Sequence, residues 1–106
     1  MGDRPFLIRS QKSQFATPEA PEHVQSTMLS NTSSKLDWDP TPRAGYYRLW
    51  KKVIGVDLEL VELGDVTEPS FTFTELPGNS QVEVVVAAVN SGGESPTSEV
   101  ITITTH

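Results

Sequence analysis

The side chains that commonly carry out chemistry are few in this sequence, and they are widely separated. His23 precedes the first β-rich stretch and His106 is the last residue, so no pair of histidines is expected to converge on a substrate. The sequence has no cysteine, which excludes disulfides and thiolate metal ligands. The glycine-rich segment 91–95 joins two expected strands and opens no helix, so it offers no phosphate cradle. We therefore expect no catalytic site.

Two pairs of carboxylates are spaced as if they shared one face of a strand. They are Asp37 with Asp39, and Asp57 with Glu59. Residues two apart on a strand point the same way, and such a pair could in principle hold a calcium ion. Acidic residues on the solvent-exposed face of a strand more commonly serve to keep a protein soluble. We accordingly predict neither a metal site nor a cofactor.

The net charge of −6 is unevenly placed along the 106 residues. Residues 1–17 contain three cations and one anion, a net of +2, which leaves five cations and thirteen anions, a net of −8, for residues 18–106. An acidic body of this kind repels a phosphate backbone, so nucleic-acid binding is not expected. No apolar stretch approaches the ~18 residues of a membrane span, and the first residues lack the apolar core of a secretory signal.

The cellular location is left open by the sequence. A chain without cysteine folds equally well inside and outside a cell. The sequence therefore fits a cytosolic protein, and it equally fits a piece of a larger extracellular or cell-surface protein.

Hydrophobic periodicity after residue 20 is typical of β-strands. Polar and apolar residues alternate, or β-branched residues cluster, in runs that end at proline and glycine turns. One run is ambiguous, because the alternation of residues 57–60 slips in phase at Val61, which predicts a bulge or a short edge strand. A helix over residues 56–63 is the alternative, since Leu and Glu are good helix formers. After a first strand that follows the prolines at 18 and 21, the expected strands are 35–38, 46–53, 57–60, 70–74, 81–89 and 99–105.

Seven short strands predict an all-β fold, a seven-stranded antiparallel β-sandwich. Turn signals recur every ~8–12 residues, and no amphipathic helix is long enough to connect parallel strands. A chain of this length supports one core. We expect residues 17–106 to form the domain and residues 1–16 to be an N-terminal tail or linker.

Over about residues 17–105 the sequence resembles the fibronectin type III domain. No single element of the resemblance is specific, whereas the ordered set is. The resemblance implies an immunoglobulin-like sandwich. The matching elements are Pro18 and Pro21, Trp38 followed by Pro40, Tyr47-Arg48-Leu49, Leu76-Pro77-Gly78, the run 84–90, and then Gly93, Ser95 and Ser98.

The resemblance also implies which side chains form the core. Trp38 would lie between the two sheets as the largest of them. One position departs from the family, where a tyrosine usually stands six residues after the turn leucine and ties the corner with its hydroxyl. This sequence has Val82 there, so the corner hydrogen bond must be absent, although we expect Val82 to be buried. The other expected core residues are Tyr47, Leu49, Phe71, Phe73, Val84, Val86, Ala88, Ile101 and Ile103.

The same alternation, applied outward, predicts an apolar outer face. If Tyr47 and Leu49 face the core, their strand neighbours face solvent, and the same holds for the neighbours of Val84 and Val86. In the family these two strands lie side by side in one sheet. Contiguous apolar patches of a few hundred Å² tend to be covered by something. The candidate binding residues are therefore Tyr46, Arg48, Trp50, Val85, Ala87 and Val89.

The sequence leaves open what covers this outer face. The apolar residues 6–8 could fold back over it or pair with a free sheet edge, a second copy of the chain could form a homodimer through it, or a different protein could dock. In the remaining alternative, Arg48, Lys51 and Glu83 shield a scattered set of apolar groups.

These features predict a non-catalytic interaction or spacer module of a larger multidomain protein, which contacts a protein partner or neighbouring domains. One alternative is self-association through the outer face or by exchange of an edge strand. Another is an accessory domain of an enzyme, with a carbohydrate or metal site. Integrin or cytokine binding is not supported, because neither Arg-Gly-Asp nor the tryptophan-serine repeat of cytokine receptor domains occurs.

Overall fold

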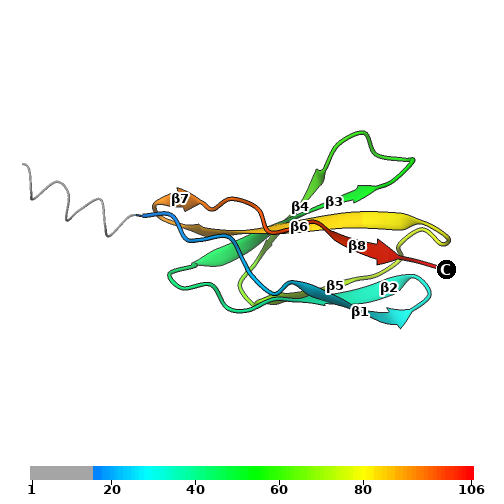
Figure 1. The fold of residues 1–106 in the computed structure, drawn as a ribbon, viewed down its shortest axis with the longest axis horizontal. Coiled ribbons are helices and arrows are strands. Elements are labelled where there is room, and N and C mark those ends of the chain that lie inside the picture. The colour runs from blue at the N-terminus through cyan, green and yellow to red at the C-terminus, as the bar shows by residue number, and fades with distance from the viewer. Residues whose placement is uncertain (1–15) are drawn as a thin grey trace, which may run out of the picture.

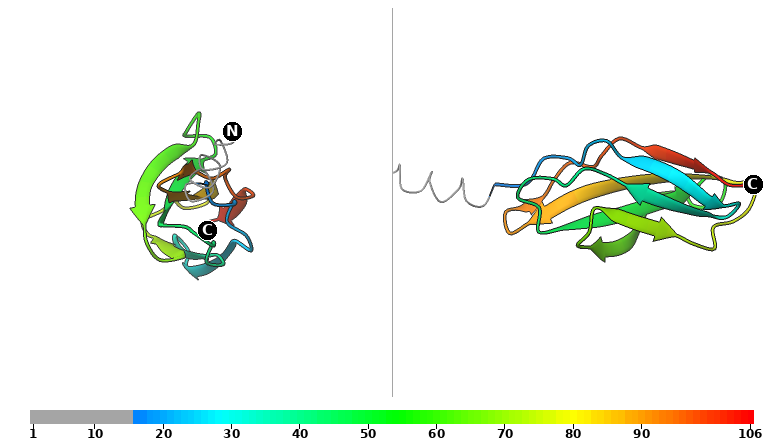
Figure 2. Two further views of the ribbon diagram at one scale, coloured as in Figure 1. Left: turned by 90° about the vertical axis from the view of Figure 1, so that its left-hand side faces the viewer. Right: turned by 90° about the horizontal axis from the view of Figure 1, so that it is seen from below.

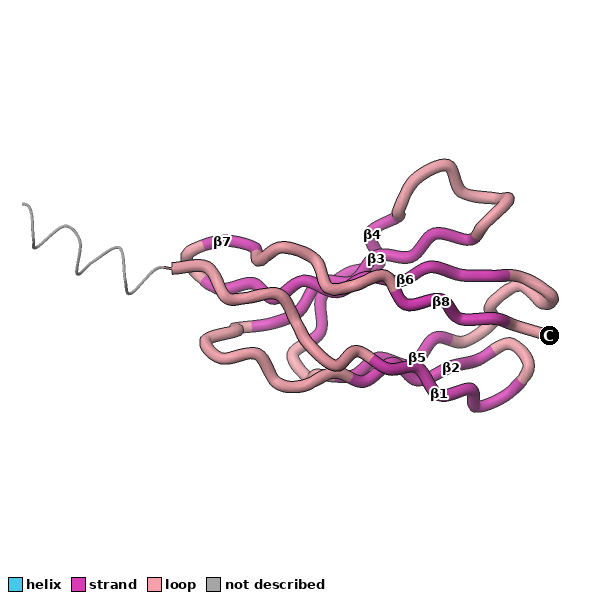
Figure 3. Tube along the Cα trace, in the orientation of Figure 1, coloured by secondary structure: helices cyan, strands magenta, loops and turns pink. Residues whose placement is uncertain are grey.

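The structure, a computed structural model, describes residues 16–106. These residues form eight β-strands joined by loops and turns, with no helix among them (Figures 1 and 3). Within this part of the chain there is accordingly no helix that could span a membrane. The strands are β1 (Gln25–Ser30), β2 (Ser33–Asp37), β3 (Tyr46–Val53), β4 (Val61–Val66), β5 (Ser70–Phe73), β6 (Gln81–Asn90), β7 (Gly93–Glu94) and β8 (Ile101–Thr104).

The strands form two antiparallel sheets that face each other (Figure 1). One sheet has the order β1-β2-β5, and the other has the order β4-β3-β6-β7 with β8 also paired to β6. The predicted all-β sandwich is confirmed. The strand count is eight and not seven, because the two-residue strand β7 forms within the glycine-rich segment 91–95, which was expected only to connect two strands.

Proline explains why β7 and β8 are separate strands beside β6. β7 pairs with β6 at Val89 opposite Glu94, whereas β8 pairs with it at Val82 opposite Ile103. In an unbroken antiparallel ladder, the numbers of the two partner residues keep a constant sum. Here the sum rises from 183 at β7 to 185 at β8, so the chain contains two extra residues between these strands. Pro96 lies in this interval and has no N–H with which to continue the ladder.

The strand predicted at residues 57–60 is wrong in its position. These residues form a bend and irregular backbone after the turn at residues 54–56, and β4 begins only at Val61. The alternative helix over residues 56–63 does not form either. The alternation of polar and apolar residues was not sufficient to predict a strand here, because it does not show whether a neighbouring strand is available for pairing.

The expected irregularity is present in β4, which is an edge strand. Leu49 of β3 lies opposite Gly64, but the next residue, Trp50, lies opposite Glu62, so Leu63 has no partner and forms a bulge. Gly64 has a φ of 135°, a backbone conformation that is open to glycine and costly for other residues.

The core lies between the sheets and agrees with the sequence prediction. The rings of Trp38 and Tyr47 meet edge to face, with centroids 5.2 Å apart and planes at 75°, a favourable geometry for aromatic pairs. Val82 is fully buried although it replaces the corner tyrosine. Phe71 and Ile101 are partly buried against the core. The remaining predicted core residues are buried, namely Leu49, Phe73, Val84, Val86, Ala88 and Ile103.

The described chain enters the sandwich at one end and leaves it at the other (Figures 1 and 2). At the first end, the side-chain amide of Asn90 donates to the carbonyl of Ala16 at 2.8 Å. At the opposite end, the backbone N–H of His106 donates to the carbonyl of Asn31 at 3.0 Å.

Candidate protein interface

The six predicted binding residues lie together on the outer face of the larger sheet. β3 and β6 place them in three cross-strand pairs, Tyr46 with Val89, Arg48 with Ala87, and Trp50 with Val85. Their exposure is unequal, since the three β3 residues are partly exposed whereas Val85, Ala87 and Val89 are 2%, 0% and 7% exposed. Only the β3 side of the predicted patch therefore offers accessible surface.

Arg48 covers much of this face. From β3 its Nε donates to Asp65 of β4 at 2.9 Å, and its Nη1 reaches past β6 to Glu94 of β7 at 2.8 Å. Its Nη2 donates to the hydroxyl of Tyr46 at 3.2 Å, and the guanidinium carbon lies 5.7 Å from the centroid of that ring. The hydrogen bond to Asp65, followed by that to Glu94, raises the pKa of Arg48 above its usual value.

The position of Arg48 agrees with the alternative in which charged side chains shield the apolar groups of the outer face. Arg48 lies opposite Ala87 on the outer face and pairs with Asp65 of β4 and Glu94 of β7, and the apolar stem of an arginine in such a position shields neighbouring side chains. Lys51 does not take part, because it lies opposite Val84, a core residue, and so belongs to the other face of the sheet. The alternative covering by residues 6–8 lies outside the described residues.

The edge of β6 between β7 and β8 is closed by two serine hydroxyls. Ser95 accepts from the backbone N–H of Ala88 at 2.8 Å, and Ser98 accepts from that of Val86 at 3.0 Å. Both serines are buried. They take over the acceptor role of the strand that Pro96 interrupts, so the backbone of β6 stays hydrogen-bonded.

A second apolar surface, which the sequence prediction missed, lies beyond the end of β3. We define the projecting loop as residues 54–63, the connection between β3 and β4 together with the first residues of β4. It rises away from both sheets (Figures 1 and 3). Leu58 is 93% exposed and Val56 is 73% exposed. The other exposed large apolar residues of the projecting loop are Ile54, Leu60, Val61 and Leu63.

Comparison with known proteins assigns the family. The sequence profile of the fibronectin type III domain matches residues 19–104. The chain belongs to this family. As a fibronectin type III domain, it shares its fold with the FN5 domain of Drosophila Lar, with a TM-score of 0.68 and 26% identity over 83% of this chain and 96% of that one.

Two curated relatives are much longer than this fibronectin type III domain. The tail tube protein gp17.1* of Bacillus phage SPP1 is 36% identical over 87 residues, which make up 82% of this chain and 31% of the relative. Contactin-5 of Danio rerio is 30% identical over 112 residues, covering 98% of this chain and 11% of the relative. The chain thus spans less than a third of either protein.

The candidate metal-binding carboxylates of the fibronectin type III domain are largely occupied by the fold. Asp39 lies 2.5 Å from Nδ1 of His23, and Asp37 lies 3.7 Å from the ammonium of Lys35. Asp57 accepts a hydrogen bond from a backbone N–H at 2.8 Å. In residues 16–106, no three potential ligands are grouped so that they could hold a metal ion.

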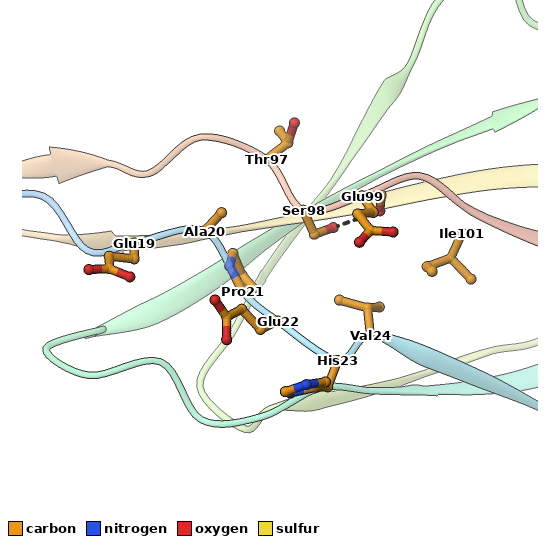
Figure 4. A pocket seen from close by; sticks show the side chains of 10 residues that line it. All are labelled: Glu19, Ala20, Pro21, Glu22, His23, Val24, Thr97, Ser98, Glu99 and Ile101. Atoms are coloured by element: carbon orange, nitrogen blue, oxygen red, sulfur yellow. Dashed lines mark hydrogen bonds between the residues drawn. The ribbon is translucent and has the colours of Figure 1, made fainter.

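An open groove runs along one side of the domain, between residues 19–24 and residues 97–101 (Figure 4). Its volume is about 660 Å³. Val24 and Ile101 give it an apolar floor, and acidic side chains such as Glu22 stand beside it. The groove borders the edge of β8, but its carboxylates do not converge on one point.

Proposed function

We propose that this fibronectin type III domain is a non-catalytic module for protein contacts or for spacing within a larger multidomain protein. The observation that carries the proposal is the kind of protein in which its relatives occur. The chain matches a minor part of a phage tail tube protein and of a contactin. A unit that recurs within such different proteins is a transferable domain, and its task is compatible with many contexts.

The path of the chain supports a spacing role. Ala16 and His106 are fixed at opposite ends of the sandwich. A domain that is entered at one end and left at the other adds its own length between its neighbours. In this proposal residues 17–106 are the folded unit, and residues 1–16 are a tail or linker.

The side-chain chemistry supports a role without catalysis. His23 is paired with Asp39, and Arg48 is paired with Asp65 and Glu94. These groups hold segments of the fold together. A general base or a nucleophile would have to face a substrate instead.

Thermal unfolding of the full chain, with and without added calcium or a panel of glycans, tests the non-catalytic proposal. A ligand that binds the native state must raise its stability. We expect one reversible transition with an unchanged Tm. A Tm that rises with calcium or with a glycan would instead favour an accessory domain of an enzyme, with a site for that ligand.

A homodimer through the outer face is a second candidate, favoured by the partial exposure of Tyr46 and Trp50. Light scattering on the wild type and on Trp50→Glu tests it. A dimer that becomes a monomer on substitution would support self-association through this face. A monomer in both cases would remove the homodimer and leave Tyr46, Arg48 and Trp50 as a candidate surface for a different protein.

A further inference from the structure

We propose that the projecting loop, residues 54–63, is a docking site for a protein segment whose apolar side chains are flanked by lysine or arginine. This inference rests on the proposed contact role and names the class of partner. It concerns a surface that adjoins the outer face of the larger sheet at Glu62, which lies opposite Trp50 and 3.7 Å from Arg48, and that extends beyond the end of β3.

The first support is the amount of apolar surface that the loop exposes. Leu58 is 93% exposed and Val56 is 73% exposed, and four further large apolar residues of the same segment are also exposed. Isolated apolar residues on a surface are ordinary, whereas a contiguous group usually marks an interaction site. The described chain offers nothing that covers this group.

The second support is that hydrogen bonds fix the loop in its projecting position. The carbonyl of Val53 accepts from the N–H groups of Val56 at 3.1 Å and Asp57 at 2.9 Å. The carboxylate of Asp57 accepts in return from the N–H of Val53 at 2.8 Å. The N–H of Ile54 donates to the carbonyl of Gln81 at 2.9 Å, which ties the loop to the start of β6.

Glycine makes this turn possible. Gly55 has a φ of 88°, which other residues adopt only at a cost. The loop is thus ordered before any partner arrives, so binding would require little further loss of conformational freedom. A loop that merely lacked structure would have no such set of bonds.

The charges of the loop identify the partner. Asp57, Glu59 and Glu62 alternate with its apolar residues. Asp57 accepts from the N–H of Val53 and Glu62 lies 3.7 Å from Arg48, so Glu59 is the carboxylate placed to meet a partner. Residues 18–106 as a whole carry a net charge of −8. A second copy would bring the same carboxylates against this surface, which like-charge repulsion opposes. An anionic membrane would be repelled in the same way. Apolar contact bordered by cations is the arrangement that satisfies both features of the loop.

The test uses the immobilised full chain and a random peptide library displayed on phage. We expect enriched peptides in which Leu, Ile or Phe is flanked by Lys or Arg. Affinity of the selected peptides, measured by fluorescence anisotropy, should fall by about tenfold or more in Leu58→Asp. Glu59→Lys should also weaken binding and should reduce its sensitivity to salt.

Matched variants keep the test specific. Val100→Asp changes another exposed apolar residue and should bind as the wild type does. Leu58 and Val100 are exposed, so both variants should keep the wild-type Tm, which circular dichroism checks. Tyr46→Ala, at the end of β3 that is far from the loop and opposite Val89, separates the loop from the outer sheet face and should retain binding.

Several results would overturn the proposal. They are the absence of any enriched peptide, enrichment of peptides without cations, and undiminished binding by Leu58→Asp. Loss of binding in Tyr46→Ala alone would move the site to the sheet face. Two further experiments test whether a second copy of the chain or a lipid surface binds the loop instead. They are sedimentation of the full chain alone and co-sedimentation with zwitterionic or anionic vesicles. Self-association or vesicle binding that Leu58→Asp abolishes would assign the loop to a second copy or to lipid. Any of these failures leaves the Tm test of the non-catalytic role intact.

Discussion

The carboxylate of Asp57 accepts a hydrogen bond from the backbone N–H of Val53 at 2.8 Å, across the turn that ends β3. The N–H of Asp57 returns a bond to the carbonyl of Val53 at 2.9 Å. This reciprocal pair stops the strand and turns the chain outward, so Leu58 points into solvent. Asp57 thus helps to fix the turn from which the apolar residues of the projecting loop extend.

A leucine pair measures the contrast between the core and the projecting loop. Leu49 is fully buried and Leu58 is 93% exposed. Leu49→Ala should lower the free energy of unfolding by about 3–5 kcal/mol, because it removes buried methyl groups and leaves a cavity. Leu58→Ala should change it by less than about 0.5 kcal/mol. Urea denaturation measures both, and similar values for the two variants would contradict the assigned burial.

The Ser98 hydroxyl should contribute measurably to stability. It accepts from the N–H of Val86 at 3.0 Å inside the sandwich edge. Ser98→Ala leaves that buried N–H without an acceptor, which should cost about 1–3 kcal/mol in the free energy of unfolding. Ser91→Ala, at an exposed position, is the matched control and should be nearly neutral. An equally small effect at Ser98 would show that water or another group replaces the hydroxyl.

The pair of His23 and Asp39 predicts a weak dependence of stability on pH. The hydrogen bond that the His23 ring donates to Asp39, and then the negative charge of Asp39, raise the pKa of His23 above 6.5. A histidine whose pKa is raised on folding stabilises the native state fully below the unfolded value, and that contribution is lost as the pH rises through the folded value.

The Tm of the wild type should therefore fall slightly as the pH rises from about 6.5 into the alkaline range. Asp39→Asn should flatten this change, and both side chains are exposed, so the effect is small. NMR titration of the His23 ring measures its pKa directly. A value at or below 6.5 in the wild type would contradict the pairing.

Removal of Arg48 should open the outer face. Arg48→Ala loses the contacts to Asp65 and Glu94 and uncovers Val85 and Ala87. We expect a lower Tm than in Lys35→Ala, whose pair with Asp37 is longer at 3.7 Å. Arg48→Lys should restore only part of the loss, because an ammonium cannot present the same fork of donors. Equal Tm values for Arg48→Ala and Lys35→Ala would show that the bridging geometry contributes nothing.

The sequence was sufficient to predict the family, and to predict which side chains of β3 and β6 face the core and which face outward. Alternation placed Tyr47 and Val84 inside and Tyr46 and Trp50 outside, and the structure agrees. Strand parity depends only on neighbours along the chain, which the sequence shows directly. The burial of Val82 was likewise predictable from its place in a β-branched run.

Contacts between distant residues were not predictable in this way. Val85 faces outward as expected but is 2% exposed, and Arg48 crosses the same face to reach Glu94, 46 residues further along the chain. The alternating residues 57–60 looked like a strand, because turn bonds such as that between Asp57 and Val53 leave no periodic signal.

The β6 side chains of the outer sheet face are buried whereas the projecting loop is exposed, and one NMR measurement compares the two. Methyl relaxation of the full chain is recorded while a neutral, soluble paramagnetic agent is added. We predict strong broadening of the Leu58 methyl groups, with the Val85 and Val89 methyl groups nearly unaffected. Broadening of the two valines that equals or exceeds that of Leu58 would contradict the account.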